Sequence, residues 1–158
     1  MSAHDEVVVM LAGDVMTGRG IDQAFARHDS PELYEPWVRD AREYLRLAEE
    51  ANGPLPRPID HDWVWGDALA ELARVRPDAR IVTLETAITT ADRPWPGKGI
   101  HYRMHPANVG LLARAGIDAC VLANNHVMDW GREGLAETLA VLAGAGVRTA
   151  GAGADADA

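Results

Sequence analysis

Residues 116–131, "GIDACVLANNHVMDWG", contain the pattern from which the fold can be predicted. The apolar run that ends at Leu122 has the length and composition of a buried strand. Three polar residues then follow in a row, Asn124, Asn125 and His126, where a simple turn would more commonly use Gly, Pro or Asp. The segment therefore predicts a buried strand whose carboxyl end carries side chains suited to a functional site.

Three other segments have the same strand character, and helical segments lie between them. The other strands are expected at residues 6–14, 79–85 and 146–153. Helices are expected, from apolar spacing and from Pro or Gly near their ends, at residues 20–27, 35–53, 65–75, 106–116 and 132–146. Strands that alternate with helices predict an α/β fold with right-handed crossovers and a largely parallel sheet.

Length, charge and cysteine content narrow the possible functions. The 158-residue chain is long enough for one domain with a real core. Its net charge is −9 and its 15 basic residues are scattered, so nucleic acid is not expected as a partner. No apolar run approaches the roughly 20 residues of a membrane span, and the N-terminus has no basic leader, so a cytoplasmic location is expected. The single cysteine, Cys120, is expected to be part of the core.

Charged and polar side chains are expected to meet where three of the predicted strands end. Asp14 ends the first strand, Glu85 the second, and Asn125 and His126 follow the third. Ligands of open α/β sheets bind outside the carboxyl ends of the strands, and neighbouring strands lie only about 4.8 Å apart. Because two nearby carboxylates repel each other, we expect one or two divalent ions between them, Mn, Fe, Zn or Mg.

Each of these residues also has an ordinary structural explanation. Asp14 follows a glycine and could simply form a turn or cap a helix. Asn124 is expected to hydrogen-bond the backbone rather than to bind an ion, and Asp129 is expected to cap the helix that follows it. Polar residues occur at the ends of three strands. One binding site explains all of them, whereas the structural explanation needs a separate reason for each, and this favours a site.

The long connection at residues 86–105 lacks periodicity, and long loops of this kind are often functional. It carries Lys98, Arg103 and His105, which are candidate residues for binding an anion or substrate. Arg19, in the glycine-rich turn after the first strand, is another candidate. Arg19 could equally be a solvated helix residue, and Lys98 could be an ordinary surface lysine.

Four segments together resemble a known protein family. They are "LAGDVMTGRG" (11–20), "IVTLETAITT" (81–90), "GKGIHYRMHPAN" (97–108) and "VLANNHVMDWGREGLAETLAVLAGAGVRTAGAG" (121–153). They resemble the CapA/PgsA-type poly-γ-glutamate capsule biosynthesis family, within the calcineurin-like metallophosphoesterase superfamily. The resemblance implies an α-β-β-α sandwich, of which residues 1–153 form the amino-terminal part. Residues 154–158, which are small and polar, are expected to be a disordered tail.

The resemblance also implies roles for individual residues. Asp14 corresponds to the first metal-binding acid, Glu85 to the bridging acid and Asn125 to a further metal ligand, while His126 corresponds to the residue that assists the transition state. The implied function is capsule biosynthesis with a metal-dependent phosphoester hydrolase site acting on a phosphoester. The alternative is a non-catalytic component that binds an anionic polyglutamate-type polymer or holds an assembly together.

The sequence departs from the superfamily pattern in three places. Met16 stands where a histidine is usual, Thr83 stands where asparagine is common, and no histidine follows His126. The remaining ligands are too few for two well-held ions. We therefore expect this chain to be a truncated part of a longer protein, weakly active or inactive alone, and to self-associate through uncovered sheet surface.

Overall fold

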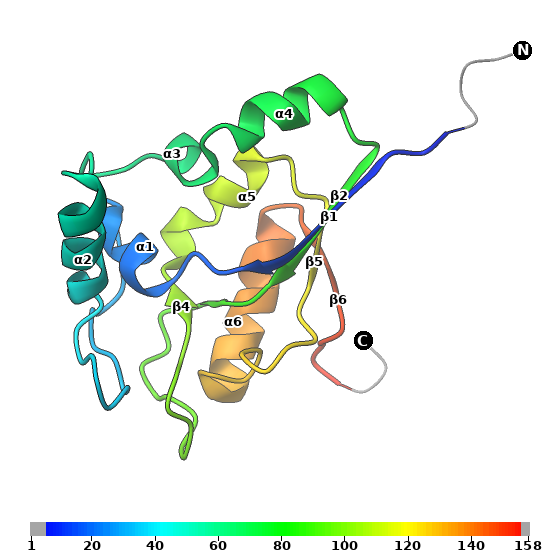
Figure 1. The fold of residues 1–158 in the computed structure, drawn as a ribbon. Helices are drawn as coiled ribbons and strands as arrows, with labels where there is room; N and C mark the ends of the chain where they lie inside the picture. The colour runs from blue at the N-terminus through cyan, green and yellow to red at the C-terminus, as the bar shows by residue number, and fades with distance from the viewer. Residues whose placement is uncertain (1–5, 156–158) are drawn as a thin grey trace, which may run out of the picture.

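The computed structural model describes residues 6–155 and is built on one four-stranded parallel sheet (Figure 1). The strands, in their order across the sheet, are β1 (Val9–Val15), β2 (Ala79–Leu84), β5 (Ala119–Val121) and β6 (Arg148–Ala150). Every neighbouring pair is parallel. The predicted α/β fold with a largely parallel sheet is therefore confirmed.

Helices connect these strands. They are α1 (Arg19–Ala24), α2 (Arg42–Asn52), α3 (His61–Trp65), α4 (Ala68–Val75), α5 (Gly110–Arg114) and α6 (Gly131–Gly144), with a short 3₁₀ helix, η1 (Pro106–Asn108), before α5. The core joins Leu112 of α5 and Leu142 of α6 to Val82 and Cys120 of the sheet, all almost completely buried. Burial raises the pKa of the Cys120 thiol to about 12, which agrees with the expected core role. Among residues 6–155, no helix is both long and apolar enough to cross a membrane.

The helix predicted at residues 35–53 begins seven residues later than expected, at Arg42. Residues 35–41 instead form bends and a bridge that pairs residues 32 and 40. The reason lies in Glu35, which is fully buried as the ion-pair partner of Arg19. This tertiary contact holds the segment outside the helix, although its apolar spacing continues the helical pattern.

Two other predicted helices are interrupted. The helix expected at 65–75 begins only at Ala68, as α4, because Gly66 adopts a positive φ of 50° that ends the preceding helix α3 at Trp65. The helix expected at 106–116 begins as η1 and becomes α5 only at Gly110. The predicted tail at 154–158 falls largely on residues 156–158, which lie outside the described part of the chain.

The long connection at residues 86–105 contains a second small sheet. Its two strands, β3 (Ala87–Ile88) and β4 (Arg103–Met104), pair in parallel and are buried. Thr138 of α6 accepts a hydrogen bond from the Ile88 N–H at 3.0 Å, and Glu137 accepts one from the Thr90 N–H at 2.8 Å. Strands of two residues are too short to show alternation in a sequence, yet they fix the loop beside the ends of β1 and β2.

The outward face of β1 is exposed to solvent. Leu11 is 73% exposed and Val9 is 46% exposed, and together with Ile81 and Val121 they belong to a largely apolar stretch of sheet. Buried strand neighbours such as Val82 and Cys120 point to the opposite, helix-covered face. The open face is the surface through which the sequence predicts self-association.

We expect Leu11→Lys to weaken that self-association, because it places a charge in the middle of the open apolar face. Sedimentation velocity at increasing protein concentration measures the effect. Leu47→Lys is the matched control, since Leu47 is also an exposed leucine, at 48%, but lies on α2. A wild-type chain that stays monomeric at high concentration would contradict the prediction.

Candidate functional site

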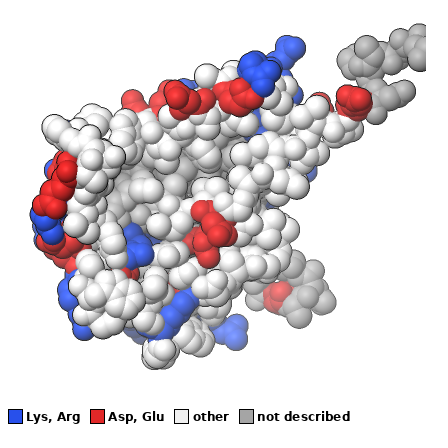
Figure 2. Space-filling model, in the orientation of Figure 1, with Lys and Arg blue, Asp and Glu red and all other residues white. Residues whose placement is uncertain are grey.

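The structure places Asp14 and Glu85 at the ends of neighbouring strands. The Glu85 N–H donates to the Val15 carbonyl at 3.0 Å, so the backbone of one acid lies beside the strand that carries the other. Asp14 is exposed and Glu85 partly exposed. Figure 2 shows acidic side chains over the ends of β1 and β2. The convergence expected from the sequence is therefore present for these two carboxylates.

Asp14 also has an unusual backbone conformation. Its φ of +53° lies in the left-handed region, which few residues other than glycine adopt, although Asp tolerates it better than most. The register between β1 and β2 shifts at this point, between Ala12 and Val15. Strained backbone of this kind often marks a functional position, since the surrounding structure must impose it.

Asn124 has the structural role expected for it. Its side-chain N–H donates to the Leu84 carbonyl at 2.9 Å, and its side-chain oxygen accepts from the His126 N–H at 2.9 Å. These bonds tie the turn after β5 to the end of β2. They hold Asn125, whose side chain is exposed, and His126 next to the strand end that precedes Glu85.

His126 is 6% exposed and held on two sides. Its ring stacks on that of Tyr102, with centroids 3.9 Å apart and planes inclined by 20°. Its Nδ1 lies 2.7 Å from an oxygen of Asp129. Because an ionised carboxylate can only accept a hydrogen bond, Nδ1 carries the proton in this contact and Nε2 is the nitrogen left for other chemistry.

The expectation that Asp129 caps the following helix is wrong. The N-cap of α6 is Trp130, which makes no side-chain capping bond, and the carboxylate of Asp129 is fully buried elsewhere. One of its oxygens accepts from His126 and from the Tyr102 N–H, at 2.6 Å, and the other accepts from the Lys98 ammonium. A buried carboxylate needs such donors, and this requirement outweighs capping.

Lys98 completes this group, which we call the Asp129 clamp: Lys98, Tyr102, His126 and Asp129. Its ammonium also donates to the carbonyl of Asn125. The side chain as a whole is 24% exposed. Anion binding by Lys98 remains a prediction, and it would have to compete with a carboxylate already in place.

Arg19 and Arg103, two other predicted anion-binding residues, are also paired with carboxylates. Arg19 contacts Glu35 at 2.5 Å and donates to the Tyr44 hydroxyl. Arg103 lies 3.6 Å from Asp29 and stacks on Trp130, 3.9 Å from the ring centroid.

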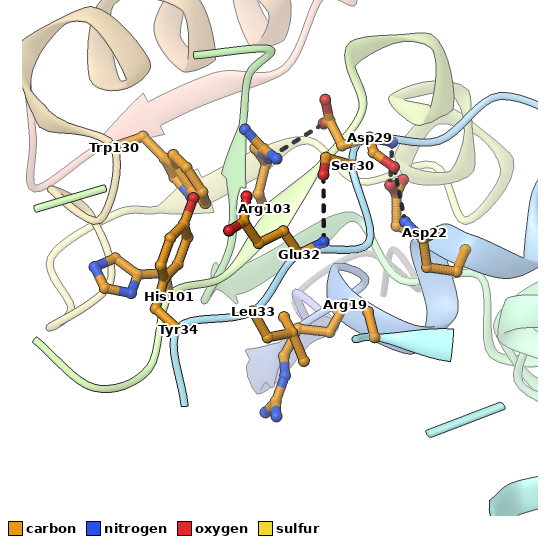
Figure 3. Close-up of a pocket in the computed structure, with 12 residues that line it drawn as sticks. Arg19, Asp22, Asp29, Ser30, Glu32, Leu33, Tyr34, His101, Arg103 and Trp130 are labelled. Atoms are coloured by element: carbon orange, nitrogen blue, oxygen red, sulfur yellow. Dashed lines mark hydrogen bonds and ion pairs between the residues drawn. The ribbon is translucent and has the colours of Figure 1, made fainter. Parts of the chain in front are cut away.

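Both arginines line a small polar cavity, where Figure 3 shows the Arg103 guanidinium turned toward Asp29. With a volume of about 20 Å³, the cavity has room for about one water molecule. Burial raises the pKa of the Asp29 carboxyl, and the charge of Arg103 offsets part of the rise.

His105 is the fourth predicted anion-binding residue. Its Nδ1 accepts from the Ala107 N–H at 3.0 Å and so caps η1, while its own N–H donates to Asp22 at 3.0 Å. The first contact is local, and the second joins the residue to α1. The four candidate residues are thus each engaged in contacts within the chain.

The predicted metal ligands provide only part of a coordination shell. Asp14, Glu85 and Asn125 offer the hard oxygen donors that Mg²⁺ and Mn²⁺ prefer. Within residues 6–155, however, no group of three or more His, Cys, Asp or Glu side chains is arranged to hold a metal ion. The described residues therefore do not complete a metal site by themselves, and the metal remains a prediction.

Sequence reasoning missed Tyr102 and gave Asp129 a capping role in place of its role in this site. Asp129 follows His126 by three residues, a spacing that brings two side chains together on one turn. This spacing could have predicted the contact between His126 and Asp129. Nothing in the sequence around Tyr102 indicates that its ring would lie against an imidazole more than 20 positions away.

We expect Asp129→Asn to lower the free energy of unfolding by about 3 kcal/mol, because it breaks a buried ion pair and leaves donors without a charged partner. Urea denaturation measures the change. Glu133→Gln is the control, since it breaks an ion pair with Arg93 that is largely exposed and should cost far less. Equal losses in the two variants would show that the Asp129 clamp does not stabilise the fold.

Residues 8–158 match the sequence profile of a family described as bacterial capsule synthesis protein PGA_cap. Probable polyglutamine synthesis accessory proteins of Mycobacterium tuberculosis, from strains CDC 1551 / Oshkosh and ATCC 25618 / H37Rv, are each 48% identical to this chain over 151 residues. The matched region is 96% of this chain and 40% of each relative, so the chain spans less than half the length of these proteins.

Proposed function

Because the chain belongs to the PGA_cap family of bacterial capsule synthesis proteins, we propose that it serves in the synthesis of a poly-γ-glutamate-type capsule polymer. Its relatives are named as accessory proteins of polyglutamine synthesis, which supports an accessory role rather than polymerisation itself. The activity proposed for the whole protein is metal-assisted hydrolysis of a phosphoester.

The observation that supports this proposal is that two carboxylates end neighbouring strands and that the turn carrying a fixed imidazole is tied to one of these strand ends. Asp14 and Glu85 end neighbouring strands, and the turn that carries His126 is tied to the end of β2 by Asn124. A divalent ion, when bound, supplies Lewis acidity and an activated water. The described residues offer it an incomplete shell, so further donors have to come from water or from outside residues 6–155.

His126 is the residue of this chain best placed to handle a proton. The Asp129 clamp fixes the ring, and Asp129 accepts a hydrogen bond from Nδ1–H, which directs Nε2 away from the carboxylate. A histidine held in one orientation can donate a proton to a leaving group or stabilise charge that develops on it. In this role Asp129 acts on the reaction through His126 and is a positioning residue.

A non-catalytic role is the second candidate, and Met16 favours it. The superfamily pattern predicts a histidine ligand there, whereas Met16 is partly buried and lines an apolar groove. In this alternative the same strand ends would contact an anionic polymer without cleaving a bond.

Metal binding tests the first requirement of the catalytic candidate. We expect Mn²⁺ to bind the chain in isothermal titration calorimetry, and Asp14→Asn to weaken that binding at least about tenfold because it removes a charged oxygen ligand. Asp67→Asn is the matched control, since Asp67 is an exposed aspartate at the start of α4. Unchanged binding in Asp14→Asn, or no binding to the wild type, would exclude the proposed metal site on this chain.

Hydrolysis of p-nitrophenyl phosphate by the full-length protein with Mn²⁺ tests the catalytic proposal. We expect His126→Ala to lower kcat by about 10²-fold or more, the typical contribution of general acid–base catalysis. Full activity in His126→Ala would overturn the role assigned to His126. Metal binding without any hydrolysis would favour the non-catalytic candidate.

A further inference from the structure

An apolar groove opens beside the candidate site. It lies between the segment that follows β1, helices α1 and α2, and the start of α3, and its volume is about 460 Å³. The apolar lining residues are Met16, Ile21, Ala24, Leu45, Ala48, Leu55 and Trp63. Figure 2 shows this face of the molecule hollowed between these helices and the acidic strand ends. The volume is within the range of small-molecule sites.

The walls of the groove are firmly positioned. A Cβ on Gly20 would lie 2.9 Å from the Tyr44 Cβ, so glycine at this position allows α1 to pack closely against α2. A Cβ on Gly18 would lie 2.5 Å from the Arg103 carbonyl oxygen, which shows that the segment after β1 packs equally closely against β4. Leu45 forms part of the buried floor, whereas Trp63 is 43% exposed at the rim. The groove therefore belongs to the packed fold rather than to a mobile loop.

One end of the groove is polar and close to the strand ends. Met16 lies two residues after Asp14, so the groove begins at the edge that carries the two acids. Arg19 is the one charged residue among the described residues that line it. Its Nη2 contacts both Glu35 and Tyr44, whereas its Nε is buried and has no hydrogen-bond partner in the described part of the chain. A buried donor without a partner requires an explanation, and a ligand acceptor provides one.

From this geometry we propose that the groove binds the aliphatic chain of an amphipathic phosphoester. The chain lies on Ile21, Leu45 and Ala48, against the Trp63 ring, and a phosphate oxygen accepts a hydrogen bond from the Nε of Arg19. This placement brings the head group to the edge that carries Asp14. The inference rests on the proposed function, since it names the substrate class for the same site.

The groove suits an aliphatic chain better than a polyglutamate chain. A polyglutamate segment carries a carboxylate on every residue, and each would lose its hydration against apolar walls without gaining a partner. An aliphatic chain gains free energy from the same contact. The single free donor at one end matches a ligand with a single polar head.

Binding of decyl phosphate below its micellar concentration tests the proposal, with EDTA present so that no metal contributes. We expect decyl phosphate to bind more tightly than either inorganic phosphate or decanol. Ala48→Phe, which fills the groove, should weaken binding at least about tenfold. Ala51→Phe is the matched control, because Ala51 is exposed on the same helix and does not line the groove.

Circular dichroism shows whether both variants fold. If Ala48→Phe does not fold, Trp63→Ala, which removes an exposed side chain at the rim, takes its place in the test. Equal binding by Ala48→Phe and the wild type, binding of decanol as tight as that of decyl phosphate, or no binding at all would overturn the proposal. The Mn²⁺ titration is independent of these measurements. Binding of decyl phosphate without binding of Mn²⁺ would support the groove proposal and exclude the proposed metal site. Binding of Mn²⁺ without binding of decyl phosphate would support the metal site and overturn the groove proposal.

Discussion

The carboxylate of Asp129 is fully buried, and its two oxygens receive hydrogen bonds from three separate places in the sequence. Removing a charge from water is costly unless donors surround it. The backbone of Asp129 adds a further contact, because its carbonyl accepts from the Trp95 N–H at 2.7 Å. The turn after β5 and the loop at 91–102 can therefore take their positions only together. His126 acquires a fixed orientation as a consequence of this requirement.

The same principle governs the other cations of the site. Lys98, Arg19 and Arg103 each lie against a carboxylate of the chain itself, Asp129, Glu35 and Asp29 respectively. Such pairs leave little net positive charge with which to attract an anion. Specificity for a ligand must then come from shape and from individual unsatisfied groups, such as the Nε of Arg19. A cation near a predicted site is therefore weak evidence for anion binding unless its partners are known.

Much of the fold was predictable because its signals are local. Three of the four strands are apolar runs that end at polar residues, and the alternation of strands with helices predicts a parallel sheet. The positions of Asp14 and Glu85 followed from the same argument. Contacts between distant segments were not predictable. Glu35 is held outside a helix by Arg19, and Asp129 is withdrawn from a capping position by Lys98 and Tyr102. In both cases a buried charge required a partner that sequence spacing does not reveal.

The left-handed conformation of Asp14 has a consequence for the evolution of the chain. A residue other than glycine in this region of backbone space costs about 1–3 kcal/mol, a cost that glycine avoids. Selection for thermal stability alone would therefore replace Asp14 with glycine. A carboxylate at this position exchanges stability for a charged group at the edge of the sheet, as proteins commonly do where activity matters. The acidic edge and the stability of the fold are thus opposed at this one residue.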